Sequence, residues 1–247
     1  MRISSKLFAA TVLSGGLALA SVPAHAVTLA PFATYTMQGT KSTIDWTKSG
    51  LHNGSIFSTK PGKANPGSPI VTFNFLDTSK YLNNLQAKLT LNGSETGVDA
   101  VGSVDQAGIL GSFSFLYDGP TTTFMGKTYT HDVTNLLTGT FTLAHITGAG
   151  TSGSFHDATD IGTVTYTSDI IDFTNSVARD FSFSLNALSP PFGYVAGNSL
   201  NTFKASSTGI FSAAFVPEPA TWAMMISGFG MLGLAARRRR SLSFAAA

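Results

Sequence analysis

Cysteine is absent from this 247-residue chain, and charged residues make up only 11% of it. Without cysteine the chain forms no disulfide and offers neither a thiol nucleophile nor a thiolate metal site. The signatures Gly-x-Ser-x-Gly and His-Glu-x-x-His are absent as well, so no catalytic motif supports an enzyme. Stability must therefore come from a packed core, for which the roughly 190 residues between the two ends are sufficient.

Positive charge is concentrated at the two ends of the chain. All 13 acidic residues lie between residues 27 and 219, whereas only nine of the 15 lysines and arginines do, which gives this middle region a net charge of −4. The whole chain carries +2 because of its ends. The middle region therefore gives no reason to expect nucleic-acid binding.

The N-terminus has the pattern of a secretory signal peptide. Two basic residues precede an uncharged, mainly apolar run over residues 7–20, and Ala24 and Ala26 form a small-x-small cleavage site. We therefore expect residues 1–26 to be removed as the chain is exported.

The C-terminus predicts a membrane anchor. Residues 220–236 contain no charge and, as a helix, would span about 26 Å, slightly less than the ~30 Å hydrocarbon core of a bilayer. Four arginines at 237–240 follow and hold this end in the cytoplasm by the positive-inside rule. Residues 241–247 then form a short cytoplasmic tail, and the exported region, residues 27–215, lies on the outer side of the membrane.

A specific motif runs through residues 216–240. Its members are Pro217, Glu218 and Pro219, then Trp222, Ala223, Met224 and Met225, then Gly228 and Gly230, and finally Arg237, Arg238, Arg239 and Arg240. Together they resemble the PEP-CTERM sorting signal, in the variant whose motif reads PEPxxWAMM. The tail after the arginines is longer than is usual for this signal.

The resemblance implies a processing route. It implies recognition by a membrane-embedded exosortase, a transient stay in the inner membrane and cleavage near the Pro-Glu-Pro motif. Release or transfer to the cell surface or extracellular matrix follows. The signal is found in Gram-negative bacteria that make exopolysaccharide.

Alternation of apolar and polar residues predicts antiparallel strands in the exported region. The clearest strands are expected at 70–76, 112–116, 138–143 and 180–188, and weaker ones at 30–37, 85–91, 121–130, 161–166, 170–173 and 208–215. Turns are expected at 53–54, 92–93, 118–120 and 148–150.

We therefore expect an all-β fold of about nine to eleven strands, an antiparallel β-sandwich of jelly-roll type in one domain. The side chains expected in its core are Phe73, Phe75, Phe115, Phe141, Leu143, Phe181, Phe183 and Leu185.

Histidines and carboxylates are the remaining candidates for chemistry. His131-Asp132 and His156-Asp157 are neighbours in sequence, so within a strand their side chains would point to opposite faces, and we expect solvated loop residues instead. His145 is expected to be a hydrogen-bonded, partly buried imidazole, and His52 a turn residue. The four aspartates between residues 157 and 172 lack the spacing of a calcium loop. No catalytic residue, metal site or cofactor is predicted.

Three functions remain open on these grounds. The preferred one is a structural or adhesive surface protein that contacts exopolysaccharide through its Ser- and Thr-rich faces, with Trp46, Tyr117, Tyr129 and Tyr194 available to stack on sugar rings. A carbohydrate-active enzyme on the same scaffold and an unprocessed type I membrane protein are the alternatives.

Overall fold

The computed structural model describes residues 28–37, 41–97, 100, 104–157 and 164–215, together with residues 225, 227–229, 231 and 232. The predicted signal peptide, with its cleavage residues Ala24 and Ala26, lies outside the described residues.

The described part of the exported region is built from β-strands and their connections. Its strands are β1 (Ala30–Met37), β2 (Ile44–Lys48), β3 (Gly54–Ser58), β4 (Ile70–Phe75), β5 (Leu85–Glu95), β6 (Asp105–Tyr117), β7 (Thr122–Phe124), β8 (Lys127–Tyr129), β9 (Asn135–Ala149), β10 (Ser152–His156), β11 (Val164–Thr167), β12 (Ser176–Ser189) and β13 (Phe203–Phe215).

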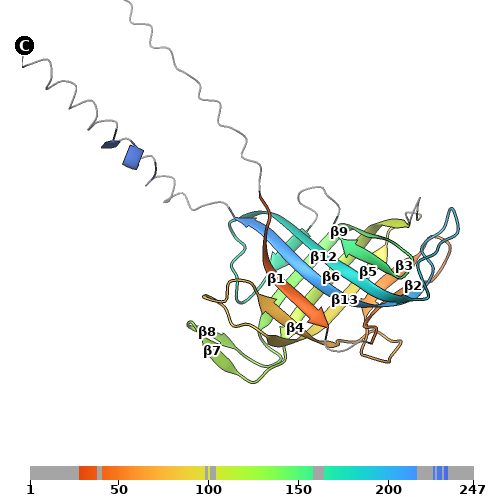
Figure 1. Ribbon diagram of the computed structural model, residues 1–247, viewed down its shortest axis with the longest axis horizontal. Coiled ribbons are helices and arrows are strands. Elements are labelled where there is room, and N and C mark those ends of the chain that lie inside the picture. Colours follow the sequence, from red (N-terminus) through yellow and green to blue (C-terminus); the bar gives the residue numbers. More distant parts are fainter. Residues whose placement is uncertain are drawn as a thin grey trace, which may run out of the picture.

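Eleven of these strands form one antiparallel sheet that closes on itself. Successive pairings run β1, β4, β5, β6, β9, β10, β12 and β13, and β13 pairs back to β1, with Ala30 opposite Ala213. The β2–β3 pair fills the wall between β13 and β5, beside the β1–β4 pair. The β7–β8 hairpin forms a separate two-stranded sheet that projects from one end (Figure 1).

This architecture confirms the prediction of an all-β, antiparallel fold. Opposite walls of the sheet pack over a common core, as the two layers of a sandwich do. Jelly-roll connectivity is not confirmed, because β4, β5 and β6 pair in chain order within one continuous sheet.

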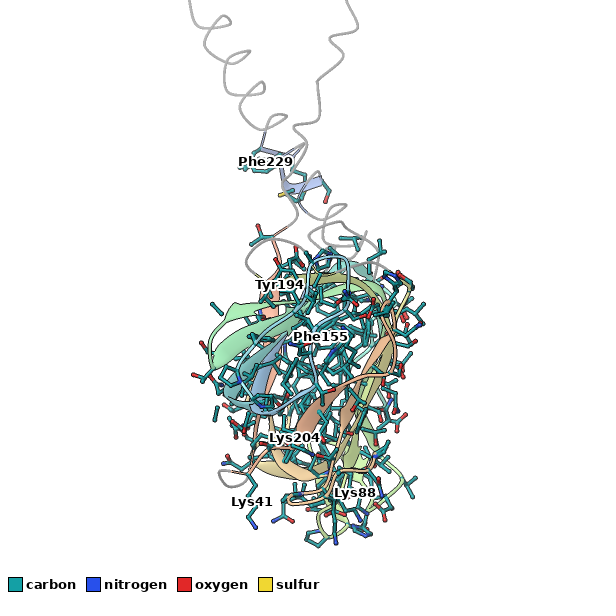
Figure 2. All side chains as sticks on the ribbon, turned by 90° about the vertical axis from the view of Figure 1, so that its right-hand side faces the viewer. Lys41, Lys88, Phe155, Tyr194, Lys204 and Phe229 are labelled. Carbon is teal, nitrogen blue, oxygen red and sulfur yellow. The ribbon has the colours of Figure 1, made fainter. Side chains whose placement is uncertain are left out.

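Aromatic rings fill the space that the sheet encloses. The ring of Phe113 lies with its centroid 5.3 Å from those of Phe181, Phe183 and Phe211, which come from two other strands. Figure 2 shows Phe155 inside this packed interior. Over most of the length of the main-sheet strands alternate residues point inward, which is the periodicity on which the core prediction rested. The side chains confirmed as buried are Phe73, Phe75, Phe115, Phe141, Phe181, Phe183 and Leu185.

Leu143 is the one wrong member of the predicted core, because its side chain is 47% exposed. Gly111 of β6 pairs with Phe141 of β9, and Ile109 pairs with Ala144. Between these two pairs β6 spans two residue steps, whereas β9 spans three. The extra residue in β9 is a β-bulge, and it moves every later side chain to the opposite face of the sheet. Ala144 therefore takes the inward position after Phe141, and Leu143 faces solvent.

The turn predicted at Asn92-Gly93 is also wrong, because both residues lie inside β5. Gly93 lies opposite Gly111 of β6, where a Cβ atom on Gly111 would lie only 2.1 Å from the carbonyl oxygen of Asn92. Glycine is present here because the two backbones approach too closely for any side chain.

Residues 170–173, predicted as a strand, belong to no strand, and the chain bends at residues 169–171. Ile170, Ile171 and Phe173 are apolar because the bend buries them against the core, and not because they belong to the sheet. Strands β2, β3 and β10 were not predicted. The chain turns back at Gly150 and Thr151 to form the β9–β10 hairpin, so the turn expected at 148–150 lies later than predicted and Gly148 and Ala149 belong to β9.

Candidate functional site

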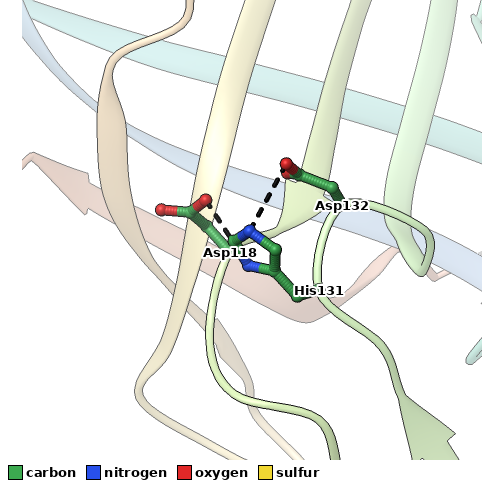
Figure 3. Close-up of side chains that lie close together, drawn as sticks. All are labelled: Asp118, His131 and Asp132. Carbon is green, nitrogen blue, oxygen red and sulfur yellow. Dashed lines mark ion pairs between the residues drawn. The ribbon is translucent and has the colours of Figure 1, made fainter.

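A lysine, two aspartates and a histidine meet at the end of the sheet that carries the β7–β8 hairpin. Lys88 comes from β5, Asp118 directly follows β6, and His131 and Asp132 lie in the loop before β9. The Lys88 Nζ lies 2.9 Å from an Asp118 oxygen and 2.6 Å from an Asp132 oxygen. His131 Nδ1 lies 3.8 Å from Asp118 and its Nε2 lies 3.4 Å from Asp132 (Figure 3).

The Lys88 ammonium offsets part of the negative charge of the two carboxylates in this cluster. One ligand atom each from Asp118, His131 and Asp132 lies within 4.8 Å of the others, which is a spacing that a cation could use. Lys88 already places a positive charge between the two carboxylates, so the cluster is an ion-pair network that ties three segments together. His131 is exposed, as predicted. The pairing of Lys88 with Asp132, 44 positions later in the sequence, leaves no sequence signal.

This network shifts two pKa values. The Lys88 ammonium holds the pKa of Asp132 below its ordinary value of 3.8. Conversely, Asp132 and then Asp118 raise the pKa of Lys88 above its ordinary 10.5. Because the pKa of Asp132 is lower in the folded protein, its carboxylate stabilises the fold above pH 3.8. This stabilisation is lost as the pH falls through the lowered pKa of Asp132. Because the pKa of Lys88 is higher in the folded protein, its ammonium stabilises the fold below pH 10.5. This stabilisation is lost as the pH rises through the raised pKa of Lys88.

Replacing Lys88 with methionine is therefore expected to lower the urea midpoint of unfolding between pH 3.8 and 10.5. The difference from the unmodified protein should become smaller as the pH falls through the lowered pKa of Asp132. Urea titrations across this pH range measure it. Lys80→Met, which breaks the more exposed Lys80–Asp77 pair, is the matched control and should have a smaller effect. An equal loss at all pH values would mean that Lys88 contributes packing and not charge.

A second polar cluster lies on the outer face where β6, β9 and β10 meet. His145 Nδ1 lies 3.0 Å from Asp105 Oδ1, and the ring stacks on that of His156 at a centroid distance of 5.9 Å. His156 Nδ1 donates to the carbonyl oxygen of Asp157, and the Thr147 hydroxyl lies 3.2 Å from His156 Nε2, at hydrogen-bonding distance.

These contacts confirm that His145 is partly buried and hydrogen-bonded. For the second pair the expectation of solvated loop residues is wrong, because His156 ends β10 and Asp157 is 4% exposed. His52 is an exposed turn residue, as expected.

A shallow polar trough of about 640 Å³ lies beside this cluster, across β9, β10 and β12. Its floor includes Ser154, whose hydroxyl lies 3.1 Å from that of Ser182, with Ser184 and Asn186 along one side. The side chains that line the trough are small, and most of them carry a hydroxyl or amide group. The trough therefore offers hydrogen bonds along a shallow surface.

Most of the aromatic residues considered for sugar stacking are in the core. Trp46, Tyr117 and Tyr129 are at most 3% exposed, so they cannot stack on a ligand at the surface. Tyr194, in the connection between β12 and β13, is half-buried.

A second cleft, of about 510 Å³, opens where β8, β11 and the start of β12 meet. Asp169 and Asp172, two of the four clustered aspartates, line it. The Asp169 carboxylate accepts a hydrogen bond from the backbone of Asn135, and Asp172 accepts hydrogen bonds from Thr174 within its own loop. Both carboxylates therefore brace loops. Asp160 lies outside the described residues.

The last strand leads directly into the C-terminal segment. Strand β13 ends at Phe215, whose ring stacks on Phe173 at 5.9 Å. Residues 215–240 match the family model described as the PEP-CTERM protein-sorting motif. The chain carries a PEP-CTERM sorting motif. No curated protein and no solved structure gives a significant match to the chain.

The PEP-CTERM motif implies export, processing by an exosortase at the membrane and then a location at the cell surface. Of the motif residues predicted from the sequence, Met225 and Gly228 belong to the described part and are helical. The other motif residues lie outside the described residues, and the individual roles of all of them stay predictions. In the part of the chain that the structure describes, no helix is both long and apolar enough to cross a bilayer.

Proposed function

We propose that the exported protein is a structural or adhesive component of the cell surface or extracellular matrix that contacts exopolysaccharide. An exosortase delivers it by cleaving near Pro217 and Pro219. The observation that carries this proposal is the PEP-CTERM motif at residues 215–240, which continues directly from the last strand of a closed sheet.

The closed sheet suits a protein that works outside the cell. Its first and last strands pair with each other, so the main sheet leaves few strand edges open to aggregation or proteolysis. Because the chain has no cysteine, it folds without an oxidant, and its stability comes from the aromatic core.

The trough across β9, β10 and β12 is the surface that we propose for polysaccharide contact. A polysaccharide presents many hydroxyl groups, and the hydroxyl and amide groups of the trough can donate to them and accept from them. Each such hydrogen bond is weak, so binding would depend on many repeats of the polymer along many copies of the protein. The proposed role requires no catalytic residue and no cofactor.

Replacing Ser184 with valine is expected to weaken binding to the exopolysaccharide of the producing bacterium about two- to thirteenfold, since one hydrogen bond contributes about 0.5–1.5 kcal/mol. Binding of the processed protein to the immobilised polysaccharide, with and without calcium, measures the effect. Ser94→Val provides the control, because Ser94 is exposed on β5, two strands away from β9.

Equal binding by both variants would contradict the choice of surface, and the absence of binding by the unmodified protein would contradict the adhesive role. Shortening of the polysaccharide in the same assay would instead support the carbohydrate-active enzyme.

A further inference from the structure

Exposed apolar side chains are found at the end of the sheet from which the chain continues into the PEP-CTERM motif. Four strands that are neighbours in the sheet, in the order β12, β13, β1 and β4, each carry one such side chain at or next to their end. We call this set the apolar rim: Val177, Phe215, Leu29 and Leu76, which are 40–48% exposed.

The backbone holds the apolar rim in place. Phe215 pairs with Ser176 of β12, and Ala213 pairs with Ala30, the residue after Leu29. The amide of Leu76 donates to the carbonyl oxygen of Phe32 in β1. Figure 1 shows β1 and β13 side by side at this end. Single exposed apolar residues are ordinary, but four on consecutive strands make the kind of surface that contacts a membrane or another protein.

The short chain between β13 and the uncharged run restricts which end of the domain can face the membrane. From Phe215 to Ala220, where the uncharged run begins, there are five residue steps, which reach at most about 18 Å in any conformation. A folded domain of about 190 residues has a diameter of roughly 40 Å. A domain held on so short a connection cannot turn its far end to the membrane.

We propose that the apolar rim rests on the outer surface of the inner membrane while the precursor is anchored there. This inference depends on the proposed function, because residues 220–236 must be held in the bilayer. The occupant is the lipid surface, since the rim consists of aliphatic and aromatic side chains, which partition into the boundary between headgroups and acyl chains. Contact at the rim holds Pro217 and Pro219 at a fixed height for cleavage, and cleavage then removes the anchor and frees the domain.

The absence of cysteine makes a direct test possible. The precursor carrying Val177→Cys or Val195→Cys is labelled with a fluorophore and reconstituted into vesicles whose lipid headgroups carry a quencher. Val195 is the matched control, because it is a valine that is 62% exposed in the connection between β12 and β13 at the opposite end of the sheet. We expect strong quenching at position 177 and weak quenching at 195.

Equal quenching at both positions, or no quenching at 177 in precursor that floats with the vesicles, would overturn the lipid contact. Precursor that fails to float would overturn the anchoring and the rim contact together. Quenching at 177 that requires added exosortase would overturn the lipid as partner and identify the enzyme instead.

A second variant tests the apolar character of the rim. Leu76→Asp is expected to lower the ratio of quenched to unquenched molecules at position 177 about fivefold, the equivalent of about 1 kcal/mol. Leu51→Asp is the control, because Leu51 is 65% exposed and lies between β2 and β3, away from the rim. Circular dichroism shows whether each variant is folded, and unchanged quenching in a folded Leu76→Asp precursor would contradict the proposal.

Discussion

Phe113→Ala is expected to lower the free energy of unfolding by about 3–5 kcal/mol, a large part of the ~5–15 kcal/mol that stabilises an ordinary domain. The Phe113 ring is 1% exposed and packs against rings of β9, β12 and β13, so its removal opens a cavity between opposite walls of the sheet. Gly139 leaves room for this ring, because a Cβ atom there would lie 2.2 Å from it. The neighbourhood is already tightly packed and can only partly close the cavity.

Urea unfolding followed by circular dichroism measures this loss. Leu110→Ala is the control on the same strand, because Leu110 points outward and is 45% exposed. We expect it to change the stability by less than about 1 kcal/mol. Similar losses for the two variants would contradict the assignment of the inner and outer faces of β6.

Replacing all of residues 237–240 with glutamine is expected to release uncut protein from the cell. Four positive charges resist transfer across the inner membrane, and without them an uncharged segment that barely spans the bilayer can follow the exported region outward. The size and location of the protein in cell fractions measure this outcome.

The variant with lysine at the same four positions keeps the charge and should be retained and cut as the natural sequence is. Normal processing of the glutamine variant would mean that the arginines do not contribute to retention.

The strand pattern could be predicted from sequence because inward and outward residues alternate in most strands. Phe181, Phe183 and Leu185 follow that rule in the middle of β12, and all three are buried. Leu143 breaks it because of one extra residue in β9, a bulge that depends on the neighbouring strand β6 and leaves no mark in the local pattern.

Contacts between distant segments could not be predicted in the same way. The pairing of β1 with β13 and the meeting of Lys88 with Asp132 depend on how the sheet closes. Asn92-Gly93 was misread for a related reason, since its glycine serves a close approach of two strands and not a turn. The PEP-CTERM motif was visible from sequence because it is a contiguous motif in which residue types and order carry the signal.

The most direct test of the account is the mass of the exported protein in a bacterium that has a matching exosortase. The account predicts a chain that begins at Val27 and ends near Pro217 and Pro219, in both the cell-surface and the released fractions. If every cell-associated molecule retained Trp222 and the residues that follow it, sorting by cleavage would be contradicted and the protein would be a permanently anchored membrane protein.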